Sequence, residues 1–339
     1  MEPALKIYEM DLPLRANPEE SCHVTFYSPQ KTAGLRGLII LFHDLADHAG
    51  RYRTLAKDVL IPAGFSLVIP DLPGFGLSAA SAPTSTMGSC MDTIATCVDL
   101  LTRETRRVPL FAMGQGMGGN LLLNYLLELS AEDPDLPARI FHAAVVTSPF
   151  LARNSPYPDF WRSILEFWGR LFPSTKKKLR LDPETLTDDR YVLLDREQDR
   201  QIVSRIQLNL YTELLRSGAR CTQEAATLAL PLLLMYGEAE SLVSRTAIRE
   251  LAGRLPEYMN VIAWPQGRHE LFAMQEREPV QRALLEYLGL CLKRGLRPIE
   301  RVRVERPKPD SGPQAGSTAA SPAASGAPAS GNPASGAAN

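Results

Sequence analysis

The chain has 339 residues, of which 45% are hydrophobic and 22% charged, and its formal net charge at pH 7 is −1. This composition is ordinary for a soluble globular protein, and the small net charge excludes a global field that would favour nucleic acid as a partner. The length fits one large α/β domain with an insertion, or two domains.

The first residues, MEPALKIYEMDLP, are partly acidic and contain no long apolar core, so we do not expect a secretory signal peptide. No apolar run approaches the ~20 residues that a membrane-spanning helix needs. The five cysteines form no CxxC pair, which fits reduced thiols better than a disulfide framework. We therefore expect a cytoplasmic protein without a transmembrane segment, a cofactor or a metal.

Short apolar runs alternate with segments of helical periodicity along most of the chain. Strands are expected at residues 22–29, 35–43, 65–71, 108–114, 142–149, 231–237 and 258–264. Helices are expected at residues 51–64, 91–104, 118–130 and 279–294. Runs such as LIILF are almost continuously apolar, as in strands that are covered on both faces. The alternation predicts an α/β fold with a mainly parallel sheet and helices on both faces.

Residues 151–226 interrupt this alternation. Between residues 160 and 172 one helical stripe is apolar, consisting of Trp161, Ile164, Leu165, Trp168 and Phe172. Residues 188–218 are interpreted as helical, without a strand. We expect a helical cap at 151–226, inserted into a core formed by residues 1–150 and 227–298. The stripe either packs on the domain below or forms an apolar lid over a pocket.

The C-terminal region, residues 299–339, is basic at first and then rich in Ala, Ser, Gly and Pro. Its last part, residues 311–339, contains no charged and no aromatic residue, and therefore predicts disorder. A second basic cluster, KKKLR, lies in the predicted cap at residues 176–180. Solvated surface is expected for both clusters, and weak contact with an anionic surface stays open as an alternative.

One turn determines the functional interpretation. In FAMGQGMGGN, residues 111–120, an apolar strand leads through a glycine-rich turn into an apolar helix. Such a turn can present a serine nucleophile at a sharp elbow, but Gly116 occupies the elbow position here. The same residues also match a dinucleotide-binding pattern, Gly-x-Gly-x-x-Gly at 114–119, which is a weak signal in the middle of a chain.

Six motifs resemble those of α/β-hydrolases in order and spacing: LFHDLADHAGRY, PDLPGFGLS, GQGMGGN, TSP, LLMYGEAESLV and GRHELF. They are similar to the subgroup that contains the monoacylglycerol lipases, the lysophospholipases and the serine aminopeptidase type. The resemblance covers roughly residues 20–293, cap included. It implies an α/β-hydrolase fold and ester hydrolysis by a serine, a histidine and a carboxylate.

The resemblance assigns each catalytic role to a position. His269 has the position of the base, after the last strand and before the last helix. Glu240 stands where the family has aspartate, and it either orients the histidine or is a surface carboxylate. The oxyanion donors would be the N–H groups of Leu45 and Met117. Gly116 stands at the nucleophile position and offers neither oxygen nor sulfur.

The segment after the second predicted strand also departs from the family. The family has His-Gly there, and this chain has His43-Asp44. An ionised Asp44 beside the oxyanion donors would oppose the negative charge of the transition state, unless its side chain points outward. The residues expected to line a binding site are His43, Asp44, Gln115, Trp161 and Trp168.

We therefore expect a pseudoenzyme, a hydrolase homologue without acyl-enzyme chemistry that binds an acyl or other lipid-like small molecule or a partner. Two alternatives stay open. One is an active carboxylic-ester hydrolase that uses another nucleophile or water activated by His269. The other is a non-catalytic scaffold that acts through its basic segment and tail. The sequence does not give the oligomeric state.

Overall fold

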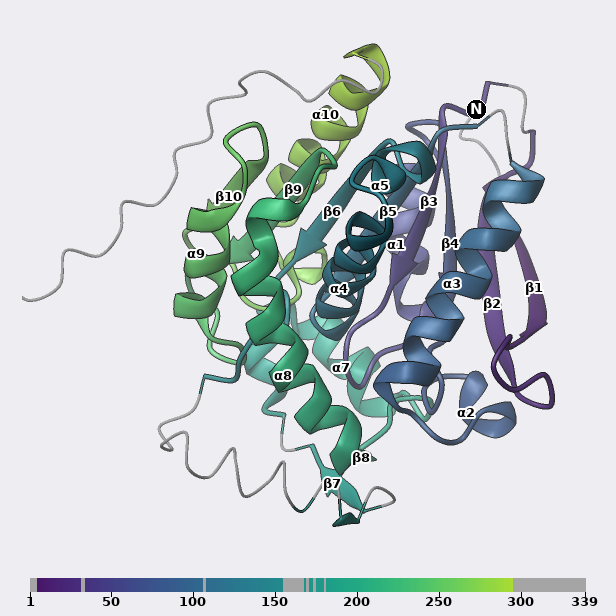
Figure 1. Ribbon diagram of the computed structural model, residues 1–339, viewed down its shortest axis with the longest axis vertical. Coiled ribbons are helices and arrows are strands. Elements are labelled where there is room, and N and C mark those ends of the chain that lie inside the picture. The colour runs from purple at the N-terminus through teal and green to yellow at the C-terminus, as the bar shows by residue number, and fades with distance from the viewer. Residues whose placement is uncertain are drawn as a thin grey trace, which may run out of the picture. The chain divides into compact units, whose positions relative to one another are not determined.

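The computed structural model describes residues 5–31, 34–105, 108–154, 168, 171–172, 175–179 and 181–294. Eight strands form one sheet in the order β1-β2-β4-β3-β5-β6-β9-β10 (Figure 1). The first two pairings, β1 with β2 and β2 with β4, are antiparallel, and every later pairing is parallel. The strands are β1 Leu5–Pro13, β2 Ser21–Pro29, β3 Gly37–Phe42, β4 Phe65–Pro70, β5 Leu110–Gln115, β6 Ala143–Thr147, β9 Leu232–Gly237 and β10 Asn260–Trp264.

The continuous apolar runs form the central strands, as expected. Every residue of β3, β4, β5, β6 and β9 is buried, because helices cover both faces of the sheet. Successive residues of a strand point to opposite faces. In β3, Ile40 and Phe42 therefore contribute to one core cluster and Ile39 and Leu41 to the other. The predicted α/β-hydrolase fold with a mainly parallel sheet is confirmed.

Each core cluster unites one face of the sheet with its own set of helices. The first contains side chains of α3 Met87–Glu104, α4 Met117–Glu132, α8 Leu208–Glu224 and α9 Arg245–Arg254. The second contains those of the helical segment between Ala49 and Leu60, which includes α1 Arg53–Leu55, and of α10 Glu278–Arg294. Figure 1 shows α3, α4 and α8 on the same side of the sheet. Short helices follow at α2 Ser78–Ser81 and α5 Leu136–Ile140.

The sequence analysis missed β1. This strand pairs with β2 along its whole length but lies at the edge of the sheet, where seven of its nine residues are exposed. Its sequence, LKIYEMDLP, mixes charged and apolar residues and lacks a continuous apolar run. β1 needs no such run, because it lies at the edge of the sheet and none of its residues is fully buried.

The segment between β6 and β9 contains two strands that were not expected. β7 Lys176–Lys178 and β8 Arg205–Gln207 form an antiparallel pair, so the expectation of a purely helical region is wrong. Two helices of this segment are described, α7 Arg190–Gln198 and α8. The amide of Asn120 in α4 donates a hydrogen bond to Leu214 O in α8 at 3.0 Å. Helix α8 is thus part of the core packing rather than a separate lid, and the limits 151–226 for a cap stay a prediction.

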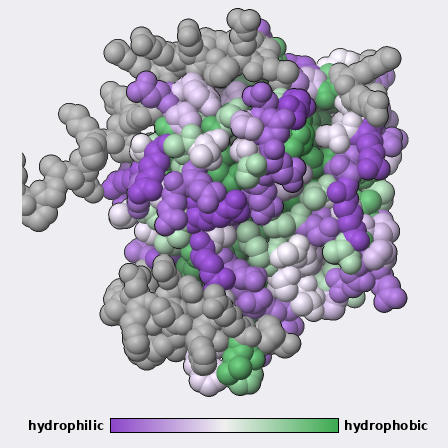
Figure 2. Space-filling view, viewed as in Figure 1, coloured by the Kyte–Doolittle hydropathy of each residue, from purple (hydrophilic) through white to green (hydrophobic). Residues whose placement is uncertain are grey.

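Two further expectations fall on residues outside the described ones: the aromatic stripe at Trp161, Ile164 and Leu165, and the tail at 299–339. On the face seen in Figure 2, hydrophilic and hydrophobic residues are intermingled. None of the helices in the described part of the chain has the length and apolar character needed to cross a membrane.

Candidate active site

The residues singled out from the sequence meet at one edge of the sheet. Asp44 follows β3, Gly116 follows β5, Glu240 follows β9, and His269 follows β10. These four strands run parallel to their neighbours in the sheet, so their carboxyl ends lie at the same edge. Loops at this edge are the usual place for ligand sites in open α/β sheets.

The turn at Gly116 has the backbone of a nucleophile elbow. Gly116 has φ 53° and ψ −113° and directly precedes α4. This left-handed conformation is costly for residues with a Cβ and open to glycine. The turn is fixed by three backbone hydrogen bonds: Gly116 N–H donates to Thr147 O, and Gly116 O accepts from Asn120 and Phe150. The elbow is therefore intact although the side chain that it would present is missing.

The carboxylate of Asp44 fills the space of that missing side chain. A Cβ built on Gly116 would overlap the Asp44 carboxyl group. Asp44 points inward, and only 6% of the residue is exposed. The sequence left open whether Asp44 points inward or outward, and the structure places it against the elbow. The absence of a side chain at Gly116 thus leaves the space that the Asp44 carboxylate fills.

The same carboxylate lies against the backbone N–H groups that were expected to form the oxyanion hole. Met117 N–H donates to Asp44 Oδ1 at 2.6 Å, and the nearby Leu45 N–H acts to lower the pKa of the same carboxyl group. Burial alone would raise the pKa of Asp44. The charge of His269, a hydrogen bond from it and the two backbone N–H groups more than offset burial, so the pKa lies below its usual value. The donors predicted at Leu45 and Met117 therefore hold an ionised carboxylate.

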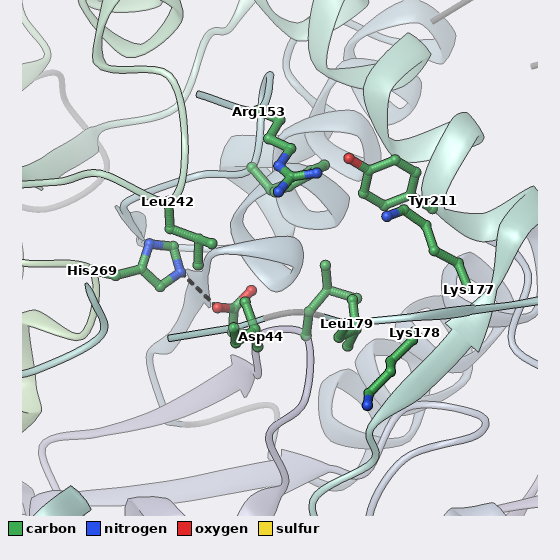
Figure 3. A pocket seen from close by; sticks show the side chains of 11 residues that line it. Asp44, Arg153, Lys177, Lys178, Leu179, Tyr211, Leu242 and His269 are labelled. Atoms are coloured by element: carbon green, nitrogen blue, oxygen red, sulfur yellow. Dashed lines mark hydrogen bonds and ion pairs between the residues drawn. The ribbon is translucent and has the colours of Figure 1, made fainter. Parts of the chain in front are cut away.

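His269 lies between two carboxylates. Its Nε2 is 2.7 Å from Asp44 Oδ2, and its Nδ1 is 2.6 Å from Glu240 Oε2 (Figure 3 shows the contact with Asp44). Burial would lower the pKa of His269, but the charges of Glu240 and Asp44 and their hydrogen bonds raise it well above the usual value. At neutral pH the ring is therefore an imidazolium, and both of its N–H groups donate to carboxylates.

Glu240 contacts the other nitrogen of this ring. It is 2% exposed, and its Oε1 accepts hydrogen bonds from Leu242 N–H at 2.7 Å and Val243 N–H at 3.2 Å. Burial acts to raise the pKa of Glu240, and His269 and these N–H groups lower it below the usual value. Of the two alternatives weighed for this position, the geometry matches the orienting carboxylate and not the surface one. The longer side chain reaches the ring at normal hydrogen-bond length.

We expect Asp44→Asn to lower the pKa of His269. The substitution removes one of the two charges that favour the imidazolium, and burial then favours the neutral ring. NMR titration of the His269 ring signals measures this pKa. Asp58→Asn is the control, because this exposed carboxylate makes the same charge change away from the site. An unchanged His269 titration in Asp44→Asn would contradict the assigned ion pair.

Three other residues that were expected to line the binding site lie elsewhere in the structure. His43 is fully buried and supports the loop: Leu72 N–H donates to its Nε2, and its Nδ1 contacts Asp44 O at 2.8 Å. Gln115 lines a separate cavity of about 560 Å³, to which α7 also contributes residues. Trp168 is 48% exposed and stacks on Phe172. None of these three lines the cavity beside His269, so we correct their expected places at the site.

The cavity beside His269 has a volume of about 320 Å³ (Figure 3). Asp44 and His269 form one wall, and apolar and basic residues from the loops and from β7 form the others. These residues are Leu45, Phe150, Arg153, Lys177, Lys178, Leu179, Leu181, Tyr211 and Leu242. Part of the basic cluster expected on solvated surface therefore borders a cavity. The described residues contain no cluster of His, Cys, Asp and Glu that could hold a metal ion.

A buried charge network next to the site was missed by the sequence analysis. Arg196 of α7 lies 2.9 Å from Glu270, and Arg51 lies 3.2 Å from the same carboxyl group. Arg51 is also 3.0 Å from Asp47, and Arg196 donates to Ala46 O. The network joins α7 to the loop that carries Asp44 and to the residue after His269. No sequence spacing indicates it, because its members come from three distant segments.

A family profile described as "Serine aminopeptidase, S33" matches residues 33–278. A monoacylglycerol lipase of Mycolicibacterium smegmatis is 24% identical over 254 residues, which are 74% of this chain and 86% of that protein. Among solved structures, the monoacylglycerol lipase of Paleococcus ferrophilus matches with a TM-score of 0.66 and 23% identity, over 85% of this chain and 99% of its own. A soluble variant of monoglyceride lipase from Saccharomyces cerevisiae, in complex with a substrate analog, matches with a TM-score of 0.72 and 17% identity. The match covers 86% of this chain and 96% of that one.

Proposed function

Because the chain belongs to the serine aminopeptidase S33 family of α/β-hydrolases, we propose that it is a pseudoenzyme of that family. It retains the fold and a ligand cavity, lacks acyl-transfer chemistry and binds a lipid-like small molecule. The observation that carries this proposal is the position of the Asp44 carboxylate, between the Met117 N–H and His269 Nε2.

Acyl transfer by this fold needs a nucleophile, a base with a free lone pair and an empty pair of oxyanion donors. Gly116 supplies no nucleophile. His269 has no free lone pair while it donates to Asp44 and Glu240. The Met117 N–H already donates to a negative oxygen, and the Leu45 N–H faces the same carboxylate. Asp44 thus engages both the base and the oxyanion donors. Its carboxylate also fills the space in which the side chain of a nucleophile would stand.

The arrangement resembles what the active enzyme forms during catalysis. In the acyl-transfer transition state a negative oxygen lies on the oxyanion donors beside an imidazolium. Here the Asp44 carboxylate provides the negative charge permanently. A substrate carbonyl would have to displace it, and breaking a buried ion pair costs about 3–5 kcal/mol. The donors therefore stabilise this protein's own side chain instead of a reaction intermediate.

The ligand class follows from the cavity and from the relatives. The walls at Phe150, Leu179, Leu181 and Leu242 are apolar, and a cavity of about 320 Å³ suits a small ligand. The similar proteins are monoacylglycerol lipases by name, and one was solved with a substrate analog. We therefore infer a ligand with an acyl chain, which this protein binds without cleaving.

The first test is reaction with a fluorophosphonate probe, followed by mass spectrometry of the intact protein. We expect no adduct, because position 116 has no oxygen to phosphonylate. His269→Ala serves as the matched control for any background reaction at surface residues. A single adduct on a residue of the cavity that disappears in His269→Ala would overturn the pseudoenzyme proposal.

A second candidate function rests on the one oxygen that stands at the elbow. Asp44 Oδ2 borders the cavity, and carboxylates serve as nucleophiles in several enzyme classes. Asp44 would displace a leaving group from an electrophilic carbon and form an ester. The leaving group would depart with the Nε2 proton of His269, so that the neutral ring can take one proton from the water that attacks Cγ. The alcohol would then leave with the second proton of that water, and one water oxygen would stay on Asp44.

This second mechanism can be separated from the first by labelling. Turnover in H₂¹⁸O would place ¹⁸O in the Asp44 side chain, which peptide mass spectrometry detects. Under the pseudoenzyme proposal we expect no label in Asp44 after incubation with alkyl substrates that carry a leaving group, because the ion pair with His269 holds the carboxylate. Asp44→Asn is the control for label in other carboxylates.

A further inference from the structure

The cavity of about 560 Å³ that Gln115 lines is separate from the one beside His269, because no described residue lines both. Tyr52 and Phe272 of its lining belong to the second core cluster. Met113 of β5 belongs to that cluster too, two residues before Gln115. Alternate residues of a strand point to the same face of the sheet. The Gln115 side chain therefore points to the face on which this cavity lies.

The side-chain amide of Gln115 is buried and has no hydrogen-bond partner in the described part of the chain. The residue is only 4% exposed. Other buried amides do have partners: that of Asn120 donates to Phe150 O at 2.7 Å, and that of Asn124 donates to Asn120 O at 2.9 Å. Burying an amide without hydrogen bonds is unfavourable, and such groups are normally satisfied by a polar partner. Because Gln115 lines a cavity, a molecule that enters there can be this partner.

The charged groups of the cavity are largely paired with each other. The pairs are Arg51 with Asp47 and Glu270, Arg277 with Asp189, and His48 with Asp199, and Glu270 also binds Arg196 behind the wall. Arg53 and Asp195 have opposite signs, are exposed, and make no ion pair with another described residue. With Arg196 included, five carboxylates stand against four guanidinium groups, so the walls are nearly balanced. An ionic ligand gains little net attraction here, and a neutral ligand avoids the cost of desolvating a charge.

Tyr191 gives the exposed side of the cavity an aromatic wall. The residue lines the cavity and is 81% exposed. An aromatic ring offers a flat apolar face. A sugar ring matches such a face beside polar groups, because C–H groups cover its faces and hydroxyls project from its rim. The Gln115 amide can accept a hydrogen bond from one hydroxyl and donate to its neighbour, whereas a hydrocarbon chain would leave it without a partner.

We propose that this cavity binds a short uncharged saccharide, with neighbouring hydroxyls on the Gln115 amide and a sugar ring against Tyr191. The volume of about 560 Å³ lies in the range of small-molecule sites, about 300–1,000 Å³. This site goes beyond the proposed lipid-binding function and does not depend on it, because the two cavities have no described residue in common.

The test follows the side-chain NH₂ signal of Gln115 by NMR in the ¹⁵N-labelled full-length protein. The signal is assigned by its absence from Gln115→Leu. Glucose and maltose are titrated, together with glucuronate and glucosamine as charged analogues. We expect the two neutral sugars to shift the signal saturably, and the charged ones to bind no more tightly than glucose. A charged sugar that binds at least about 10-fold more tightly than glucose would show the uncharged class to be wrong. If no sugar shifts the signal, the amide is only hydrated and the proposal fails.

Variants, titrated with maltose by calorimetry, test the two contacts. Gln115→Leu should weaken binding at least about 10-fold, because the hydrogen bonds of the amide are lost. It should not lower the melting temperature, because the leucine replaces a group without a partner. Tyr191→Ala should weaken binding about 10-fold through loss of the aromatic wall.

Gln207→Leu is the matched control. This glutamine is also buried, but its amide donates to Pro83 O at 3.5 Å and it does not line the cavity. The variant should therefore bind maltose as the wild type does. Unchanged maltose affinity in Gln115→Leu would place the sugar elsewhere and overturn the proposal. A drop of several degrees in the melting temperature of Gln115→Leu would assign its amide a structural role and contradict the proposal as well.

Discussion

The double variant Asp44→Gly/Gly116→Ser is expected to react with fluorophosphonate probes and to hydrolyse p-nitrophenyl esters at least about 100-fold faster than the wild type. The serine supplies the missing oxygen at an elbow whose backbone is intact. Removal of Asp44 frees the Met117 and Leu45 N–H groups, and oxyanion donors of this kind are worth about 10²–10³ in turnover. It also frees His269 Nε2 to act as the base.

The control Asp44→Gly/Gly116→Ala opens the same donors without supplying an oxygen, so it should not react. Adding His269→Ala to the active variant should abolish turnover. Adding Glu240→Asp should not help, because Glu240 already lies 2.6 Å from the ring and the shorter side chain would withdraw from it. A folded double variant that neither reacts nor hydrolyses would show that changes beyond these two positions removed the activity.

Gly116→Ala alone is expected to destabilise the protein by about 2–6 kcal/mol. Left-handed backbone strain accounts for about 1–3 kcal/mol of this, and overpacking against Asp44 for a similar amount. The carboxylate cannot move aside freely, because Met117, Leu45 and His269 hold it. The strain follows from the elbow conformation alone. The overlap with Asp44 adds a second cost that the sequence did not reveal.

A double-mutant cycle of denaturant unfolding measures this overlap. In the Asp44→Gly background, Gly116→Ala should cost only the strain of about 1–3 kcal/mol. The difference between the two backgrounds is the coupling energy of positions 44 and 116, which neighbours in contact show and distant sites do not. Equal costs in both backgrounds would mean that the Asp44 carboxylate does not occupy the space beside Gly116.

The strands could be predicted from the sequence because they depend on local patterns, and the positions expected to form the site came from the motifs that resemble the family. Buried parallel strands are short continuous apolar runs, and β3, β4, β5, β6 and β9 all have this pattern. Strand β1 was missed since an exposed edge strand needs no such run. The absence of a nucleophile could also be read directly, because Gly116 has no side chain whatever its surroundings.

Only the tertiary structure decided what surrounds that glycine. The direction of the Asp44 side chain depends on donors 73 and 225 residues away along the chain, at Met117 and His269. The exposure of Trp168 and the place of Lys177 beside the cavity likewise depend on contacts between distant segments. By itself the sequence determined that the serine is gone. Packing and electrostatics between distant segments determined that a carboxylate holds its place, because a buried charge lies where its hydrogen-bond partners are.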